Sequence, residues 1–136
     1  MLFRSITFET LSDVDFLKNL SLQSVVIDMG TSGVEFAREL ATLYRSWNYK
    51  YIDAPVSGSV ATIASHQLLV MASGEDEYID YVSQVLLTFS KQVLHIGKAG
   101  TGQVMKLAVN SIVHSLNVAV AESLALAGKE IGRAHV

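Results

Sequence analysis

The chain has 136 residues, and half of them are hydrophobic, which suffices for the core of one domain of ordinary size and argues against a disordered chain. Ten Lys and Arg against 13 Asp and Glu give a net charge of −3, which disfavours a nucleic-acid partner bound through a basic face. Because the chain has no cysteine, it has no disulfide, no thiolate metal site and no cysteine nucleophile.

Residues 1–12 alternate apolar and polar side chains, without the basic start and the sustained apolar stretch of a secretory signal. No run of residues reaches the roughly 18 unbroken apolar positions of a membrane span. We therefore expect a soluble intracellular protein without a membrane partner. The pattern leaves the compartment, cytoplasm or mitochondrion, open.

Strand patterns and helix patterns alternate along the chain. The expected strands are short apolar or β-branched runs at 24–29, 51–56, 67–72 and 92–96. The expected helices are a short capped helix at 12–20, a helix with a Ser32–Glu35 capping box and with Phe36, Leu40, Leu43 and Trp47 at helical intervals, a helix opened by the acidic run 75–77, and a long helix at 102–128. This order predicts an α/β fold with a sheet of mostly parallel strands.

The long helix predicted at 102–128 is apolar almost all the way round, and it is about 39 Å long if unbroken. A helix of this kind is normally buried by neighbours on several sides, and this sequence does not contain them. The short helix at 12–20 also makes the chain begin in the middle of a strand and helix alternation. We therefore interpret the chain as a fragment of a longer protein.

The last seven residues read Glu-Ile-Gly-Arg-Ala-His-Val, which is also the in-frame translation of a widely used short-read sequencing adapter. We expect residues 131–136 to be a non-native tail and exclude them from the reasoning about fold and function. Glu-Ile-Gly at 130–132 is alternatively native.

The segment Gly97-Lys98-Ala99-Gly100-Thr101-Gly102 follows a predicted strand and opens a helix, as a dinucleotide-binding loop does. That fingerprint needs a third glycine at position 105, which is Met, and an acidic residue about 20 positions further on at a strand end. Neither is present. The glycines are better explained by a tight turn and close packing at the start of the helix.

Polar residues form one stripe on the long helix. Lys106 and Asn110 are four apart and therefore project from the same face, and His114 and Asn117 extend the stripe. Lysine and asparagine are costly to bury without partners. The stripe therefore faces either a cleft with a ligand, or solvent at the edge of a packed helix. We assign no catalytic role to His114.

Two further segments follow predicted strands. Ser57, Gly58 and Ser59 either offer backbone N–H groups and a hydroxyl to a carboxylate or form an ordinary turn. Thr31 lies past the end of the first strand, where open α/β sheets bind ligands, and it is alternatively a helix cap. The four His are scattered without metal-ligand spacing, so we expect no metal site.

Three blocks occur in order: Val-Ile-Asp-Met-Gly-Thr at 26–31, Asp-Ala-Pro-Val-Ser-Gly at 53–58, and Gly-x-x-Gly-x-Gly-x-x-x-Lys-x-x-x-Asn at 97–110. Together they resemble the β-hydroxyacid dehydrogenase family, which includes 3-hydroxyisobutyrate dehydrogenase and, more distantly, 6-phosphogluconate dehydrogenase. The resemblance implies that residues 1–97 are the distal, C-terminal part of a Rossmann-type NAD(P)-binding domain. Residues 98–130 would be the long interdomain helix that begins an all-helical substrate and dimerisation domain.

The resemblance also implies residue roles. Lys106 would give or take the hydroxyl proton of the substrate while hydride moves to or from the nicotinamide of NAD or NADP, and Asn110 would orient this lysine. Residues 57–59 would bind the substrate carboxylate, and Thr31 would lie near the nicotinamide. This chemistry requires the tip of Lys106 to face the serine and glycine corner at 57–58.

The implied parent protein interconverts a small 3-hydroxy acid and its semialdehyde and is a homo-oligomer. Gly30, Ser59 and Val109 depart from the usual family pattern, and the upstream glycine-rich loop is missing, so the substrate and the choice of NAD or NADP stay open. We expect little or no turnover from this chain alone. The alternatives are a non-enzymatic dehydrogenase-like module for binding or oligomerisation, and a fragment that assembles through its long helix.

Overall fold

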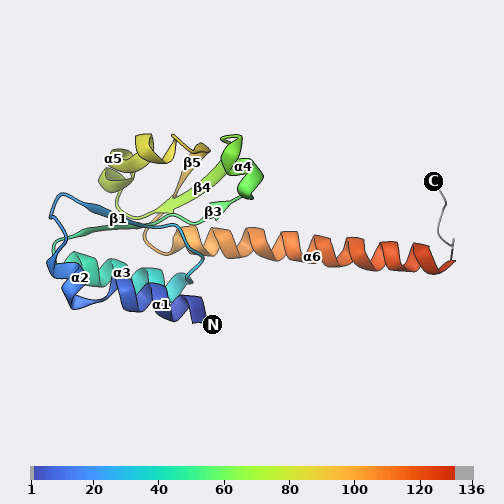
Figure 1. Ribbon diagram of the computed structural model, residues 1–136, viewed down its shortest axis with the longest axis horizontal. Coiled ribbons are helices and arrows are strands. Elements are labelled where there is room, and N and C mark those ends of the chain that lie inside the picture. The colour runs from blue at the N-terminus through green and yellow to red at the C-terminus, as the bar shows by residue number, and fades with distance from the viewer. Residues whose placement is uncertain (1, 131–136) are drawn as a thin grey trace. The chain divides into compact units, whose positions relative to one another are not determined.

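The computed structural model describes residues 2–130, with side chains described over residues 6–129, and the chain divides after Lys106 into two compact units. The helices are α1 (Leu2–Leu11), α2 (Val14–Lys18), α3 (Val34–Ser46), α4 (Val60–Ala64), α5 (Asp76–Leu86) and α6 (Thr101–Glu130) (Figure 1). The strands are β1 (Val25–Asp28), β2 (Lys50–Asp53), β3 (Val56–Ser57), β4 (Leu68–Ser73) and β5 (Ser90–Gly97). The α/β fold predicted from the alternation is confirmed.

The five strands form one sheet that is rich in parallel pairing. β1 pairs parallel with β2, and β4 pairs parallel with β5. β5 pairs with one edge of β4, and β2 and β3 pair with its opposite edge. Both run antiparallel to β4, with Asp53 opposite Ser73 and Val56 opposite Val70. This reversal arises because only a short segment containing α4 joins β3 to β4, which is too little chain for a parallel crossover.

The strand expected at 51–56 is divided into β2 and β3 by Ala54 and Pro55. Proline has no backbone N–H to donate, so it interrupts a ladder of strand hydrogen bonds. Its carbonyl still accepts a hydrogen bond from the Met71 N–H at 2.9 Å, and pairing with β4 then resumes. The chain therefore keeps its pairing with β4 on both sides of Pro55, while its pairing with β1 does not continue into β3.

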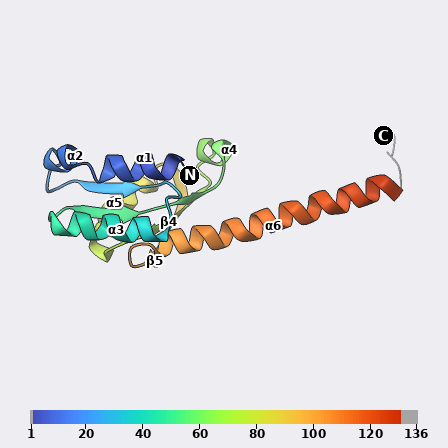
Figure 2. The same ribbon diagram turned by 90° about the horizontal axis from the view of Figure 1, so that it is seen from below.

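Helices cover both faces of the sheet. α1, α2 and α3 lie on one face, side by side in the second view, and α5 lies on the other (Figures 1 and 2). Because neighbouring residues of a strand point to opposite faces, Tyr51 joins Leu17, Leu40 and Tyr44 in one core, while Ile52 joins Ile79, Val82 and Leu86 in the other. The helix predicted to open at the acidic run is therefore confirmed as α5, with one face buried against the sheet.

α3 begins differently from the predicted Ser32–Glu35 capping box. Its N-cap is Gly33, and the Ser32 hydroxyl donates instead to Asp28 Oδ2 at 2.8 Å. The capping-box prediction is wrong because the buried carboxylate at the end of β1 engages that hydroxyl. The buried side chains of α3 are Ala37, Leu40 and Tyr44. Trp47, expected within this helix, lies outside it at the C-cap and stacks on Tyr49.

α1 and α4 have no counterpart among the predicted elements. α1 is held against α3, since the rings of Phe8 and Phe36 meet edge-on with their centroids 5.1 Å apart. The Tyr44 hydroxyl also donates to the Leu11 carbonyl at 2.9 Å, and burial raises the pKa of Tyr44 to about 12. The short helix expected at 12–20 is confirmed as α2, whose N-cap Asp13 accepts a hydrogen bond from the Phe16 N–H at 2.8 Å.

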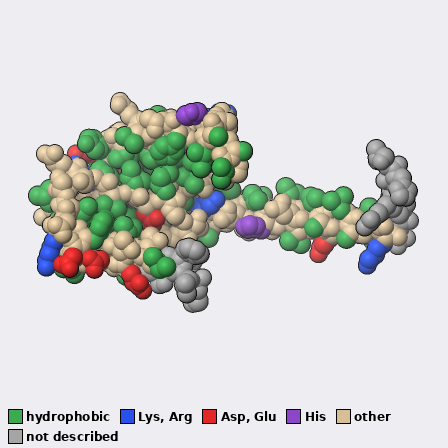
Figure 3. All heavy atoms as spheres, in the orientation of Figure 1, with side chains coloured by type: hydrophobic (Ala, Val, Ile, Leu, Met, Phe, Trp, Pro, Cys, Tyr) green, Lys and Arg blue, Asp and Glu red, His purple; other side chains and the backbone are tan. Residues whose placement is uncertain are grey.

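α6 is the predicted long helix, and the burial of its side chains changes along its length. Its first turn is packed against the sheet, and Gly102 and Gln103 are buried. The side chains from Ser111 to Lys129 are all exposed, and hydrophobic side chains run along the helix (Figure 3). The sequence predicts an apolar helix that this chain does not cover, and α6 beyond Asn110 is such an exposed helix.

α6 has the length and mean hydropathy of a membrane span, and it is the one such helix among the described residues. Lys106, Glu122 and Lys129 interrupt its apolar sequence. A helix buried by other helices of a soluble protein shows the same pattern of length and hydropathy. This length and hydropathy are therefore common to a membrane span and to a helix that other helices cover.

We expect Gly102→Ala to destabilise the chain and Gly128→Ala to leave its stability unchanged or slightly raised. A Cβ at Gly102 would overlap the Met71 carbonyl of β4, whereas a Cβ at Gly128 meets nothing within 4 Å. Overpacking of this kind costs about 1–3 kcal/mol, while alanine in an exposed helix is favoured over glycine by about 1 kcal/mol. Urea unfolding followed by Trp47 fluorescence measures both, and equal losses of stability would contradict the close packing at Gly102.

Candidate functional site

The start of α6 is bonded to a fully buried carboxylate at the end of β2. Asp53 Oδ1 accepts hydrogen bonds from Ser73 Oγ at 2.6 Å and from the Gly100 N–H at 2.8 Å, and Oδ2 accepts one from the Gln103 N–H at 3.3 Å. Ser73 Oγ accepts a further bond from the Gly102 N–H at 2.9 Å. The first N–H groups of a helix have no partner within it, and a negative charge is favourable there. Asp53 therefore fixes the start of α6 to the sheet.

Burial raises the pKa of Asp53 above its ordinary value, because the charged form loses its hydration. The hydrogen bonds from Gly100, Ser73 and Gln103 act in the opposite direction, since they stabilise the carboxylate. The neighbouring Tyr51 is buried as well, and its pKa is raised by burial and by the charges of Asp28 and Asp53. The tyrosine therefore stays protonated, and its hydroxyl donates to Asp28 Oδ2 at 3.4 Å.

The side chain of Gln103 bonds α6 to the loop between β1 and α3. Its Nε2 donates to the Gly30 carbonyl at 3.0 Å, and its Oε1 accepts from the Gly33 N–H at 3.3 Å. Asp28 holds the same loop from within, since Oδ1 accepts from the Gly30 N–H at 2.9 Å and Oδ2 from Ser32 Oγ. Thr31 lies between these anchors and is exposed.

These bonds bring together the three sequence blocks that carry the family resemblance. Asp28 and Gly30 belong to block 26–31, Asp53 to block 53–58, and Gln103 to block 97–110. Asp28 and Asp53 are also directly opposite each other in the β1 and β2 pairing. Segments that are 47 to 73 residues apart in the chain therefore meet at the start of α6.

Lys106 lies on the second turn of α6, is half-buried and is the last residue of the first unit. Within the described part of the chain, its ammonium group forms no hydrogen bond or ion pair. Asn110 is half-buried on the same helix and belongs to the second unit, as do His114 and Asn117, which are exposed.

The corner at 57–59 is closed by α4. Ser57 pairs with Leu69 of β4, and Gly58 has a φ of +147°, where a Cβ would overlap the Thr62 side chain. The Ser59 N–H donates to Thr62 Oγ1 at 2.6 Å, so this amide is already occupied. Among the described residues no hydrogen bond links this corner to Lys106 or to the loop of Thr31. The bonds thus join Thr31's loop to the helix of Lys106, and they do not extend to the corner.

The residues that sequence reasoning missed are Gln103 and Asp53. Asp53 was part of a matching block without a role of its own, and Gln103 was an unassigned position between Gly102 and Val104. The signal in the sequence was a polar side chain inside an apolar strand or at an apolar helix start, since buried polar groups need partners. The identity of those partners depends on contacts across the fold.

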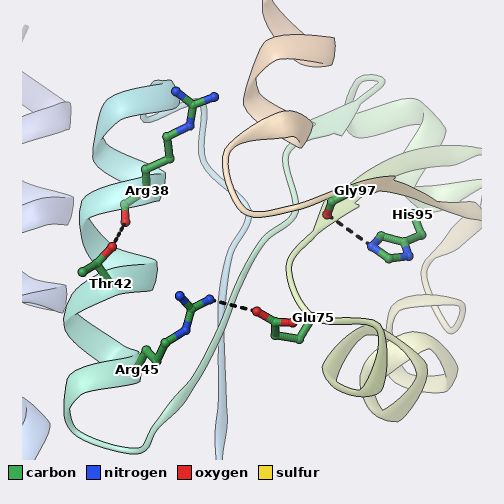
Figure 4. A network of polar contacts seen from close by, with 6 residues as sticks. All are labelled: Arg38, Thr42, Arg45, Glu75, His95 and Gly97. Atoms are coloured by element: carbon green, nitrogen blue, oxygen red, sulfur yellow. Dashed lines mark hydrogen bonds and ion pairs between the residues drawn. The ribbon is translucent and has the colours of Figure 1, made fainter.

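A surface pocket of about 600 Å³ lies elsewhere and contains none of the predicted site residues. It is lined by α3, the start of α5 and the β5–α6 loop, with Arg45, Glu75, Tyr78 and Lys98 among its residues. Arg45 reaches Glu75 at 2.8 Å, and Arg38 points away from this pair (Figure 4). Both partners are exposed, and such pairs contribute about 1 kcal/mol or less. No group of acidic and His residues among those described can hold a metal ion.

Residues 5–97 match the family model described as the NAD binding domain of 6-phosphogluconate dehydrogenase. A probable 3-hydroxyisobutyrate dehydrogenase of Mycobacterium tuberculosis is 34% identical over 106 residues, which are 78% of this chain and 36% of that protein. The chain therefore spans little more than a third of the length of this relative.

Solved structures agree. The 3-hydroxyisobutyrate dehydrogenase of Mycobacterium tuberculosis with L-serine matches with a TM-score of 0.83 and 31% identity, over 93% of this chain and 44% of that one. An imine reductase of Myxococcus stipitatus in complex with NADP+ has a TM-score of 0.85 at 16% identity, over 94% of this chain and 44% of that one, and shares the fold.

Asp53→Asn is expected to lower the free energy of unfolding at neutral pH by about 1–3 kcal/mol, because an amide nitrogen would face the N–H donor of Gln103. Since the pKa of Asp53 is raised, the folded chain takes up this proton at a higher pH than the unfolded chain does. The stability advantage of the wild-type chain over Asp53→Asn should therefore widen as the pH falls from neutral toward about 4.

Urea unfolding at several pH values, followed by Trp47 fluorescence, measures this advantage. Asp80→Asn on the exposed side of α5 is the matched control, and it should change stability by less than about 0.5 kcal/mol. An advantage that shrinks as the pH falls would show that the pKa of Asp53 is lowered in the folded chain.

Proposed function

The chain belongs to the family of NAD-binding domains of 6-phosphogluconate dehydrogenase, and on that premise we propose that it is part of an oxidoreductase of the 3-hydroxyisobutyrate dehydrogenase type. The enzyme interconverts a small 3-hydroxy acid and its semialdehyde with NAD or NADP. The observation that carries the proposal is the junction at the start of α6, where Asp53 and Gln103 join the three matching blocks. The mycobacterial relative, whose name states this activity, supports the same reaction class.

Residues 1–97 form the distal part of the NAD(P)-binding domain in this proposal. The family match ends at Gly97, which is also the last residue of β5. Residues 98–130 then form the interdomain helix that begins a helical substrate and dimerisation domain. Residues 131–136, assigned to a non-native tail, lie outside the described residues. Because the chain spans 36% of its curated relative, we expect it to have little or no turnover by itself.

The loop between β1 and α3 fits a cofactor ring. It lies at the carboxyl ends of the parallel strands β1 and β2, where open α/β sheets bind ligands. Gly30 and Thr31 are exposed there, and the loop is fixed by Asp28 and Gln103. Thr31 would contact the nicotinamide, which supplies or accepts the hydride when the cofactor is bound.

Lys106 is the proton-transfer group of the proposed reaction. When the alcohol is oxidised, its hydroxyl proton passes to the Lys106 amine while hydride leaves the carbon that bears this hydroxyl. In the reverse direction, the Lys106 ammonium returns the proton to the oxygen. Asn110, one turn further along α6, orients the lysine and the substrate. Ser57, Gly58 and Ser59 form the corner that receives the carboxylate. The Ser57 hydroxyl and the Gly58 amide are the donors in this proposal, because the Ser59 amide is bonded to Thr62.

Lys106→Ala in the full-length parent enzyme should lower kcat by about 10²–10⁴-fold, because general acid–base catalysis contributes that much. Cofactor affinity should stay within a few fold of wild type. Lys129→Ala, an exposed lysine on the same helix, is the control and should keep full activity. Stopped-flow NAD(P)H formation and cofactor titration measure the two effects. Unchanged turnover in Lys106→Ala would favour a non-enzymatic dehydrogenase-like module.

Assembly through α6 is the second function that a specific observation favours. Its apolar side chains are exposed, as the fractions of 71% for Ile112, 61% for Leu116 and 69% for Leu124 show. Contiguous apolar surface of this kind marks an interaction site. We propose that other chains of the parent homo-oligomer cover this surface in the complete enzyme.

The isolated chain should therefore associate as its concentration rises. Static light scattering over a wide concentration range should show a growing average mass. The double variant Leu116→Lys, Leu124→Lys should return the mass toward that of a monomer, while Glu122→Gln on the same helix should not. A wild-type chain that stays monomeric at high concentration would contradict assembly through α6.

A further inference from the structure

We propose that Gln103 is a positioning residue that sets the place of the Thr31 loop relative to the helix of Lys106. The proposal rests on the proposed dehydrogenase function, in which Thr31 lies near the nicotinamide and Lys106 moves the proton. Gln103 itself touches neither group in this role. It acts through the backbone of the loop.

Gln103 is fully buried and is bonded on three sides. Its N–H donates to Asp53 Oδ2 on β2, its Nε2 donates to the Gly30 carbonyl, and its Oε1 accepts from the Gly33 N–H. The last two partners are 73 and 70 residues away in the sequence. The side chain must therefore donate and accept at once over this reach, which among neutral side chains of this length only the amide of glutamine does.

The two anchors of the loop have different consequences. Asp28 belongs to the strand that leads into the loop, so its bonds to Gly30 and Ser32 fix the shape of the loop locally. Gln103 belongs to α6, so its bonds fix where the loop lies relative to that helix. Removing the Gln103 amide should therefore leave a shaped loop that is no longer tied to α6.

Gln103 and Lys106 lie on the same helix, close to each other. Gln103 and Lys106 are three residues apart on α6, so their side chains leave the helix on the same side. Helix and loop then keep a constant separation as long as the amide bonds persist. A misplacement of about 1 Å between reacting groups costs up to about 10²-fold in rate, so a loosened loop should affect turnover more than binding.

The first arm of the test measures the link in the 136-residue chain by amide hydrogen exchange. Gln103→Met keeps the size of the side chain and removes both hydrogen bonds, so exchange at Gly33 should accelerate about tenfold or more relative to wild type. Gln84→Met, on the exposed side of α5, is the matched control and should leave Gly33 unchanged. Unchanged protection of Gly33 in Gln103→Met would overturn the proposal.

Gln103→Glu keeps the test decisive where the methionine variant fails to fold. A protonated glutamic acid has the donor and the acceptor of glutamine, whereas the ionised form has lost its donor and faces the Gly30 carbonyl. The ionised form still accepts from the Gly33 N–H, so the loss falls on the bond to the Gly30 carbonyl. The free energy of unfolding of Gln103→Glu relative to wild type at the same pH should therefore be lowered at neutral pH and recover as the pH falls. A relative stability without this pH dependence would overturn the proposal.

The second arm measures catalysis in the full-length parent. Gln103→Met should lower kcat about 10–100-fold, with the KM for the hydroxy acid and the Kd for the cofactor changed less than about threefold. A residue with a merely structural role would lower stability and both affinities together, and that result would overturn positioning. So would unchanged kcat in a variant whose loop is loosened. An inactive wild-type parent overturns the proposed function, while the exchange arm still decides whether Gln103 holds the loop.

Discussion

The buried carboxylate of Asp53 is the constraint on which the rest of this structure depends. A fully buried charge is costly unless it is paired or bonded, and here three donors and the positive end of a 30-residue helix offset part of that cost, while burial still raises the pKa of Asp53. The donors lie on β4, in the loop before α6 and in the first turn of α6. The end of β2, the end of β4 and the start of α6 must therefore meet at one point.

The same constraint explains the glycines before α6. The N–H groups of Gly100 and Gly102 are used by Asp53 and Ser73, which are groups of the protein itself. A loop whose amides are occupied in this way has none of those N–H groups left for a phosphate. The glycines serve close packing instead, because a Cβ at Gly102 would overlap the backbone of β4. The glycine-rich loop between β5 and α6 therefore serves to fix α6 to the sheet.

The division of α6 into a packed start and an exposed remainder matches the length of the chain. The first turn is held by Asp53 and Gln103, and the residues beyond it expose apolar side chains. The chain spans 44% of the solved mycobacterial enzyme, and the match covers 93% of this chain. A helix that is apolar all round gains stability only from partners on several sides, so the exposed part of α6 is the part of this molecule that its own chain stabilises least.

The sequence by itself determined the alternation of strands and helices, the extent of α6 and the family of the chain. Apolar periodicity and the glycine and proline positions act over a few residues, and each of the three blocks is a continuous stretch of the sequence. The tertiary structure alone decided that Ser32 bonds to Asp28 and leaves Gly33 as the N-cap of α3, that β4 runs against β2, and that α1 forms against Phe36. It also decided the bonds of Gln103 and Asp53, because their partners lie 20 to 73 residues away and only the fold brings them within reach.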